Sequence, residues 1–328
     1  MFPAYVGFFG GNQGWMREMT ANGQSRMQTY GAWIATRYKN QKNLVWMMGG
    51  DMGSFNTAQN DAEMGLFNGV KSVAGQQSTL FSTEWGGDSI ATGQPTFGRS
   101  MTLNGVYAWS GLVNSWGRNA YGRTPVEPAF LLDGPYDEEG PDGNSINWHA
   151  TEPVRRFQWW GWLSTIGGYI TGNGYVWPCV EWRAHLYTQG SRDLARLNAF
   201  MQSIPWYTLV PSGMSGMRTL VSGNSAADAD DYVTAAATPD GTLLVAYVPP
   251  ARTGSITVDM GAMSGPSGAR WFNPTNGIYT QVATGLANSG SRAFTPPGNN
   301  SAGQREWVLV LDTGTGAPAA PTDLRIVP

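Results

Sequence analysis

The sequence predicts an α/β barrel over about the first 215 residues and an antiparallel β-sandwich after it. Strand-like apolar runs alternate with segments of helical periodicity up to about residue 210. Several of these runs end on a carboxylate or an aromatic residue, which is typical of barrels because their active sites collect residues from many strand ends on one face. After residue 219 the runs become short and alternating, with Gly, Pro and Asn turns between them.

The barrel elements are predicted in the order strand, helix, strand. The strands are apolar runs of the kind that a sheet covered on both faces requires, and they lie at Phe2–Phe9, Asn43–Met48, Ser78–Trp85, Gly105–Trp109, Pro128–Asp133 and Gly168–Gly174. The helices are predicted at Trp15–Arg37, Asn60–Val73, Leu112–Tyr121, Glu152–Gly167 and Ser191–Met201. A doubly wound sheet would fit the same order, but it usually carries a Gly-rich phosphate loop, which this sequence lacks.

The predicted β-domain spans residues 219–313. Its strands are predicted at Tyr232–Ala235, Leu243–Val248, Ser255–Val258 and Glu306–Leu311, with a turn within Arg270–Gly277. Residues 314–328 read as a Gly/Ala/Pro/Thr linker that leads into the first strand of a further module.

The composition narrows the class of partner. Only 13% of the residues are charged, whereas Trp (15) and Tyr (13) are plentiful. Aromatic faces and neutral polar groups suit sugars, so an oligosaccharide or polysaccharide is the expected partner. A net charge of -3 without a run of Lys or Arg argues against nucleic acid, and no stretch is long and apolar enough to span a membrane.

No cofactor or metal is expected. Cys179 is the single cysteine, which excludes an internal disulfide. His149 and His185 lack neighbouring His or Cys residues in the sequence, so a zinc site is not predicted.

Asp51 and Asp133 are the candidate catalytic pair. Cleavage of a glycosidic bond needs two carboxyl groups, about 5–5.5 Å apart in a retaining enzyme and about 6.5–9.5 Å apart in an inverting one. Both residues end predicted strands, and strand ends on one barrel face can meet that condition. Asp also favours helix N-caps and turns, so an ordinary turn role stays open for each.

Two segments resemble signatures of a known family. Asn43–Asp51 (NLVWMMGGD) resembles the Asn-x-x-Trp-x-x-Gly-Gly-Asp signature of the apiosidase-like glycoside hydrolase family. Asp133–Asp137 (DGPYD) resembles the family's Glu-x-x-Tyr-Glu motif, with Asp in place of both Glu residues.

The resemblance continues through the rest of the chain. Arg155–Trp160 is similar to an Arg-x-x-x-Tyr/Trp segment of the family, and Gly167–Gly174 with Trp177 is similar to the glycine-rich strand that follows. Residues 232–310 resemble the companion β-domain, which carries a collagen-binding label.

The resemblance implies a (β/α)8 TIM-type barrel that works by a retaining mechanism. Asp51 would be the acid/base after the fourth strand, and Asp133 the nucleophile after the seventh. With Phe2–Phe9 as the third strand, the first two β/α units are absent from this sequence, and the open barrel edge predicts self-association. Because Asp is shorter than Glu, Asp137 and Glu138 remain alternatives for the nucleophile.

The expected function is hydrolysis of a plant or algal polysaccharide by a secreted or periplasmic bacterial protein. Two alternatives stay open: a non-catalytic glycan- or matrix-binding protein derived from such a hydrolase, and an inactive fragment of a longer enzyme. The residues expected to contact substrate are Glu84, Trp85, Tyr107, Trp109, Tyr136, Asp137, Asn173 and Trp177.

Overall fold

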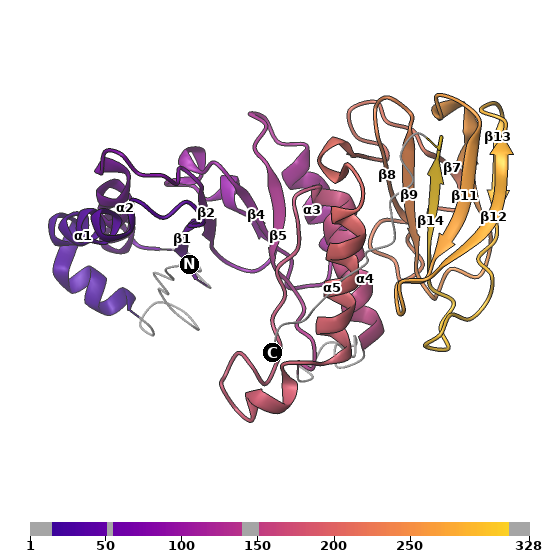
Figure 1. The fold of residues 1–328 in the computed structure, drawn as a ribbon. Coiled ribbons are helices and arrows are strands. Elements are labelled where there is room, and N and C mark those ends of the chain that lie inside the picture. The colour runs from indigo at the N-terminus through magenta and orange to yellow at the C-terminus, as the bar shows by residue number, and fades with distance from the viewer. Residues whose placement is uncertain (1–14, 51–54, 140–150, 315–328) are drawn as a thin grey trace. The chain divides into compact units, whose positions relative to one another are not determined.

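A computed structural model of the chain describes residues 15–50, 55–139 and 151–314, and the structural statements below concern these residues (Figure 1). They divide into two compact units. The first unit contains residues up to 110 together with 119–133, and the second contains 111–118 and the residues from 134 onward. The predicted strand Phe2–Phe9 lies outside the described residues.

Within the described residues, the first unit is built on short parallel strands. Its strands are β1 (Trp46–Gly49), β2 (Phe81–Glu84), β3 (Ser89–Ile90), β4 (Asn104–Tyr107) and β5 (Ala129–Asp133). β1 is parallel to β2 and β4 is parallel to β5, whereas the short β3 runs antiparallel to β4. The amides of Thr102 and Leu103 both donate to the Phe81 carbonyl at 2.9 Å, so β4 starts beside the start of β2. The carboxyl ends of these parallel strands therefore lie along one edge.

Two helices of this unit pack closely against each other. They are α1 (Met16–Tyr38) and α2 (Thr57–Ser72). A capping box starts α2, because the Asn56 side chain accepts from the Gln59 amide while the Gln59 side chain accepts from the Asn56 amide. The core of the unit joins these helices to the strands and includes Met27, Ile34, Trp46, Met48, Leu66, Phe67, Phe81 and Phe97.

The second unit combines helices with two antiparallel sheets. Helix α3 (Val113–Tyr121) begins in it, and α4 (Thr151–Thr165) and α5 (Gln189–Gln202) belong to it. The six-stranded sheet has the order β12 (Tyr279–Leu286), β11 (Ser267–Phe272), β14 (Trp307–Asp312), β9 (Leu243–Val248), β8 (Thr234–Ala237) and β6 (Val210–Pro211). The three-stranded sheet has the order β13 (Ser291–Phe294), β10 (Ile256–Asp259) and β7 (Leu220–Ser222). Short 3-10 turns lie at Ala91–Gly93, Gly98–Ser100, Trp182–His185, Trp206–Thr208 and Met260–Ala262.

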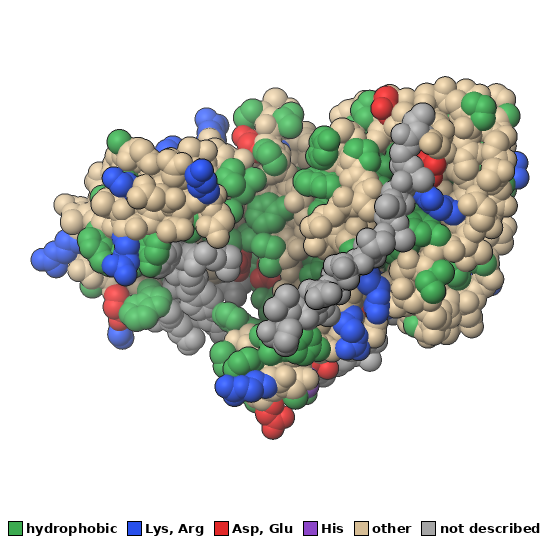
Figure 2. Space-filling model, in the orientation of Figure 1, with side chains coloured by type: hydrophobic (Ala, Val, Ile, Leu, Met, Phe, Trp, Pro, Cys, Tyr) green, Lys and Arg blue, Asp and Glu red, His purple; other side chains and the backbone are tan. Residues whose placement is uncertain are grey.

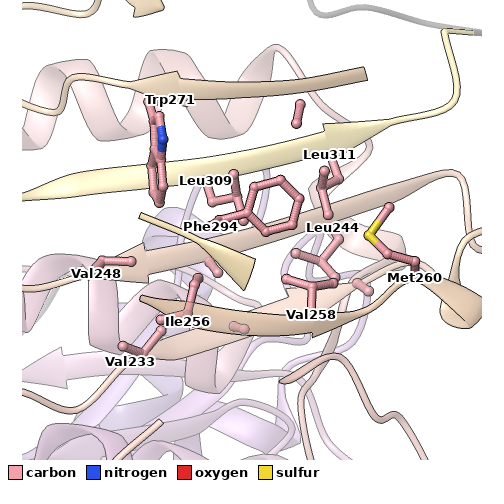
Figure 3. Packing of buried hydrophobic residues seen from close by; sticks show 14 of the residues in the cluster. Val233, Leu244, Val248, Ile256, Val258, Met260, Trp271, Phe294, Leu309 and Leu311 are labelled. Atoms are coloured by element: carbon pink, nitrogen blue, oxygen red, sulfur yellow. The ribbon is translucent and has the colours of Figure 1, made fainter. Parts of the chain in front are cut away.

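The two sheets share one apolar core (Figure 3). Leu244 and Leu309 from the six-stranded sheet meet Ile256, Val258 and Phe294 from the smaller sheet. This pairing of two antiparallel sheets around buried alternating residues is the arrangement of a sandwich.

Helices α4 and α5 cover the other face of the six-stranded sheet. The Trp159 ring on α4 stacks on Tyr247 of β9 with centroids 5.7 Å apart and an interplanar angle of 3°. Phe200 on α5 contacts Phe272 of β11 at 4.9 Å between centroids. Every residue of β9 is buried because the sheet is covered on both faces, which explains its unbroken apolar sequence.

A buried ion cluster lies in this helix-to-sheet layer. The Arg155 guanidinium on α4 donates to Asp193 on α5 at 2.7 Å and to Glu306, next to β14, at 2.7 Å. The Tyr247 hydroxyl donates to the same Glu306 carboxylate at 2.6 Å. Burial opposes the charged guanidinium, but the neighbouring Glu306 and Asp193 carboxylates outweigh it and raise the pKa of Arg155.

Most predicted elements within the described residues are confirmed with small shifts at their ends, and the mixed α/β character and the sheet-rich C-terminal part are as expected. The predicted strand Gly168–Gly174 is wrong. Among the described residues that segment forms no regular strand: it carries single bridge positions at Tyr169 and Asn173, and Asn173 pairs with Asp137 in parallel. The predicted domain limits stay a prediction. No helix among the described residues has the length and apolarity needed to cross a membrane.

Candidate functional site

The carboxyl ends of the parallel strands carry most of the predicted site residues of the first unit. In the β1–β2 register Gly49 lies opposite Glu84, and in the β4–β5 register Tyr107 lies opposite Asp133. The structure thus places Glu84 at the carboxyl end of β2 and Asp133 at the carboxyl end of β5.

A two-glycine turn ends β1. Gly49 and Gly50 both have positive φ, 77° and 134°, a conformation that glycine adopts without strain. The Gly50 amide donates to the Glu84 carbonyl at 3.0 Å, and the Gly49 amide donates to Oε1 of Glu63 at 3.1 Å. Asp51, the predicted acid/base, follows this turn in the sequence but lies outside the described residues.

Glu63 is a residue that the sequence reasoning missed. Its side chain on α2 is completely buried, and burial raises its pKa to about 7, although the hydrogen bond from Gly49 acts in the opposite direction. A Glu within a helical apolar pattern gives no local sign of this role, because only the fold brings it under the turn.

Asp133 ends β5 and is half-buried. Its carbonyl accepts from the Ala108 amide at 2.9 Å, which ties the end of β5 to the end of β4. A register shift between Val106 and Tyr107 changes the pairing at this point. Asp133 therefore occupies a defined position at the strand edge.

The predicted aromatic contacts of the first unit differ in exposure. Tyr107 is buried, whereas Trp85 and Trp109 are half-buried. The Trp85 indole donates to the Ile90 carbonyl at 3.0 Å, so its orientation is set by the neighbouring strand. Trp109 packs beside Gly87, where a Cβ would come within 3.0 Å of it.

The second unit holds the turn that follows Asp133 in the sequence. Asp137 is only 4% exposed, and burial raises its pKa although Thr188 and Asn173 hydrogen-bond to it. Gly190, at the start of α5, leaves the space that its carboxyl group occupies, because a Cβ there would lie 2.5 Å from Oδ2. Asp137 therefore supports the turn from inside, whereas Tyr136 is half-buried with its ring over Gly172.

Glu138 points its carboxylate at a second residue that sequence reasoning missed. Its Oε2 lies 2.6 Å from Nδ1 of His185 and accepts from the Asn173 side chain at 3.0 Å. The His185 ring stacks on Tyr175 with centroids 3.8 Å apart. His185 lies 47 residues from Glu138, and the sequence offered no metal-ligand spacing that would have singled it out.

The remaining predicted contact residue, Trp177, follows Asn173 by one turn. Its amide donates to the Asn173 carbonyl at 3.0 Å, and its side chain is 52% exposed. Within the described residues, Asp137, Asn173 and Trp177 thus come together in the second unit, while Glu84, Trp85, Tyr107, Trp109 and Asp133 lie at strand ends of the first.

The part of the chain that the structure describes contains no group of three or more His, Cys, Asp or Glu residues arranged to hold a metal ion. The face shown in Figure 2 is mostly neutral, with scattered basic and acidic side chains rather than a large patch of one sign. Such a surface suits an uncharged or weakly charged partner.

Comparison with family models matches both parts of the chain. The model described as "Apiosidase-like, catalytic domain" matches residues 1–208, and the model described as "Putative collagen-binding domain of a collagenase" matches residues 218–312. None of the curated proteins matches the sequence.

Solved structures show the same fold at low identity. A protein described as a glycoside hydrolase has a TM-score of 0.78 and 16% identity, over 93% of this chain and 73% of that one. A family 5 glycoside hydrolase from Bacteroides vulgatus has a TM-score of 0.71 and 17% identity, over 88% of this chain and 66% of its own. A family 27 β-L-arabinopyranosidase from Geobacillus stearothermophilus has a TM-score of 0.52 and 10% identity, over 89% of this chain and 63% of its own.

The solved structures show that this chain has a fold also found in glycoside hydrolases. The family of the chain is shown by the match to the family model. Because the catalytic-domain model covers 208 of the 328 residues, the chain belongs to the apiosidase-like glycoside hydrolase family.

Proposed function

We propose that this protein hydrolyses glycosidic bonds in a plant or algal polysaccharide by a retaining double displacement. β1, β2, β4 and β5 then correspond to strands four to seven of a (β/α)8 barrel. Asp51 is the acid/base after the fourth strand, and Asp133 is the nucleophile after the seventh. A polysaccharide substrate requires that the protein works outside the cytoplasm, as a secreted or periplasmic enzyme.

The observation that carries this proposal is the position of Asp133 at the carboxyl end of β5, on the strand edge that also carries the Gly49–Gly50 turn. Membership of the family supports hydrolysis of a glycosidic bond, which needs two carboxyl groups. The carboxyl ends of the parallel strands offer a common edge for such a pair. The alternatives for the nucleophile are less suitable. Asp137 is buried within its turn, and the Glu138 carboxylate is already held by His185 and Asn173.

The proposed reaction has two steps. The Asp133 carboxylate attacks the anomeric carbon while the Asp51 carboxyl group protonates the departing glycosidic oxygen, giving a glycosyl ester on Asp133. Water, deprotonated by Asp51, then displaces Asp133 from the anomeric carbon and releases the sugar with its original configuration.

Replacement of Asp133 by Asn tests the proposal. We expect Asp133→Asn to lower the rate of sugar release from responsive polysaccharides at least about a thousandfold, because the amide cannot form the ester intermediate. The measurement is reducing-sugar release from a panel of plant and algal polysaccharides.

Asp61→Asn is the matched control. Asp61 lies on the exposed face of α2 in the same unit, so the same change of charge there should leave the rate intact. If Asp133→Asn and the unmodified protein release sugar at equal rates, Asp133 is not the nucleophile.

A further inference from the structure

Asn173 organises a small polar and aromatic cluster in the second unit. Its Oδ1 accepts from the amides of Tyr175 at 2.9 Å and Val176 at 3.1 Å, and its carbonyl accepts from the Trp177 amide at 3.0 Å. Its Nδ2 donates to Oε2 of Glu138 at 3.0 Å. One side chain thus fixes both the Glu138 carboxylate and the backbone of the aromatic turn Tyr175–Trp177.

The cluster also contains backbone strain. Glu138 has φ = 56°, a left-handed conformation that is uncommon for residues with a side chain. Gly174 allows the close approach of this strained turn, because a Cβ there would lie 2.4 Å from the Glu138 carbonyl oxygen. Strain of this kind persists where the surrounding structure enforces it, and it is concentrated at functional sites.

The Glu138–His185 pair offers acceptor atoms to a ligand. An ionised carboxylate accepts hydrogen bonds only, so Nδ1 of His185 donates to Oε2 and, in the uncharged imidazole, Nε2 is an acceptor. Among the described residues, the Asn173 side chain and the His185 ring both bond to Oε2 of Glu138, and Oε1 can accept from a further donor. The side chains of Glu138 and His185 are 32% and 20% exposed, so solvent reaches both.

We propose that Glu138, His185 and the aromatic turn Tyr175–Trp177 form a binding subsite for an uncharged, hydroxyl-rich sugar ring. The inference rests on the proposed function only in taking the substrate to be a glycan. Sugar hydroxyls donate to Oε1 of Glu138 and Nε2 of His185, and the exposed aromatic side chains pack against the apolar face of the ring.

The Glu138 carboxylate disfavours an acidic sugar. A uronate carboxylate carries acceptors only and would meet the acceptors of Glu138 and His185. It would also add a negative charge beside Glu138, whose charge already acts with burial to raise the pKa of the adjacent Asp137. The subsite should therefore select neutral pentose or hexose units over uronic acids.

Binding to a chain that carries Asp133→Asn tests the subsite without turnover. The probes are neutral arabino-, galacto- and xylo-oligosaccharides and, as the acidic probe, an oligogalacturonide, titrated in a calorimeter. We expect at least one neutral probe to bind and the oligogalacturonide not to bind. Glu138→Gln should weaken binding of that neutral probe about tenfold or more, because a charge-assisted hydrogen bond is lost. Trp177→Ala, which changes an exposed side chain, should weaken it as well.

Two matched controls lie outside the cluster. Glu181→Gln removes an exposed carboxylate of the same loop, and Tyr207→Ala removes an aromatic ring that is 72% exposed. Both should leave binding unchanged, and circular dichroism should show the same folded state for all variants.

The subsite is overturned if no neutral probe binds, if the oligogalacturonide binds more tightly, or if Glu138→Gln and Trp177→Ala bind like the parent. Failure of the proposed function is a separate result. In that case the unmodified protein releases no sugar, or Asp133→Asn releases it at the normal rate, while the binding losses at Glu138 and Trp177 still report on the subsite.

Discussion

At the scale of single residues, Glu63 shows how burial changes the chemistry of an ordinary side chain. Its Oε1 accepts the Gly49 amide, and Oε2 has no hydrogen-bond partner within the described structure. A buried carboxylate without full hydrogen bonding is costly, so the folded protein favours the neutral carboxyl group. The pKa of Glu63 accordingly rises from 4.5 to about 7.

This shift predicts a loss of stability with rising pH. Because the folded-state pKa is raised, the folded protein binds the proton more tightly than the unfolded chain does, and stability falls as the pH increases from about 4.5 to about 7. The loss is on the order of 3 kcal/mol. Glu63→Gln keeps an acceptor for Gly49 without ionising, so it should raise the unfolding temperature at pH 8 but not at pH 4.

The matched control is again Asp61→Asn on the same helix, whose exposed side chain should change stability little at either pH. Thermal unfolding followed by circular dichroism gives both values. If Glu63→Gln and the unmodified protein respond to pH in the same way, Glu63 does not titrate as described.

At the scale of elements, glycines set how closely α1 and α2 approach. Gly31 on α1 and Gly65 and Gly69 on α2 are buried in their contact. A Cβ on Gly69 would lie 2.1 Å from the Gln28 carbonyl oxygen, and one on Gly31 would lie 2.2 Å from the Leu66 carbonyl oxygen. The backbones therefore touch directly, and either helix would have to move to accept a methyl group.

Gly69→Ala should consequently destabilise the protein. Alanine favours a helix by about 1 kcal/mol over glycine, but overpacking of a close contact costs about 1–3 kcal/mol, and a rigid carbonyl offers little relief. We expect a lower midpoint of chemical unfolding for Gly69→Ala. Gly265→Ala is the control, since no atom lies within 4 Å of its added Cβ. A higher midpoint for Gly69→Ala would contradict the close-packed contact.

Elements with strong periodicity were predictable, and the irregular segment was not. Helix α2 and strand β9 follow from apolar spacing and run length, which are local properties. The segment Gly168–Gly174 has the composition of a buried strand, but its glycines instead accommodate Tyr136 and Glu138 from a distant turn. That requirement is tertiary, so the sequence pattern alone misassigned it.

At the scale of the whole molecule, the six-stranded sheet is not an independent module. Its strands β9 and β11 contact α4 and α5 through Trp159 and Phe200. The sequence predicted the sandwich from its alternating strands, but it gave no indication that the helices cover the second face. Likewise the candidate residues Asp51 and Asp133 came from motifs, whereas Glu63 and His185 required the fold, because their partners are remote in sequence.

The ion cluster of Arg155, Asp193 and Glu306 should stabilise the packing of α4 and α5 on the six-stranded sheet. Arg155 is 1% exposed, and its removal would leave Glu306 buried without its cation and Asp193 paired with Arg196 alone. We expect Arg155→Met to lower the free energy of unfolding by about 3–5 kcal/mol. The exposed pair Arg17–Glu18 provides the comparison, and Arg17→Met should change the free energy of unfolding little, because solvent screens exposed ion pairs. Similar losses for both variants in urea unfolding would rule out a special role for the buried cluster.

The central claim, that Asp133 is the nucleophile of a retaining glycosidase, is tested most directly by azide rescue. Asp133→Ala leaves room for azide to attack the anomeric carbon while the acid/base still protonates the leaving group. We predict that azide restores substrate cleavage and yields a glycosyl azide of inverted configuration, observed by ¹H NMR. Full activity of Asp133→Ala without azide, or inversion of configuration by the unmodified enzyme, would contradict the account.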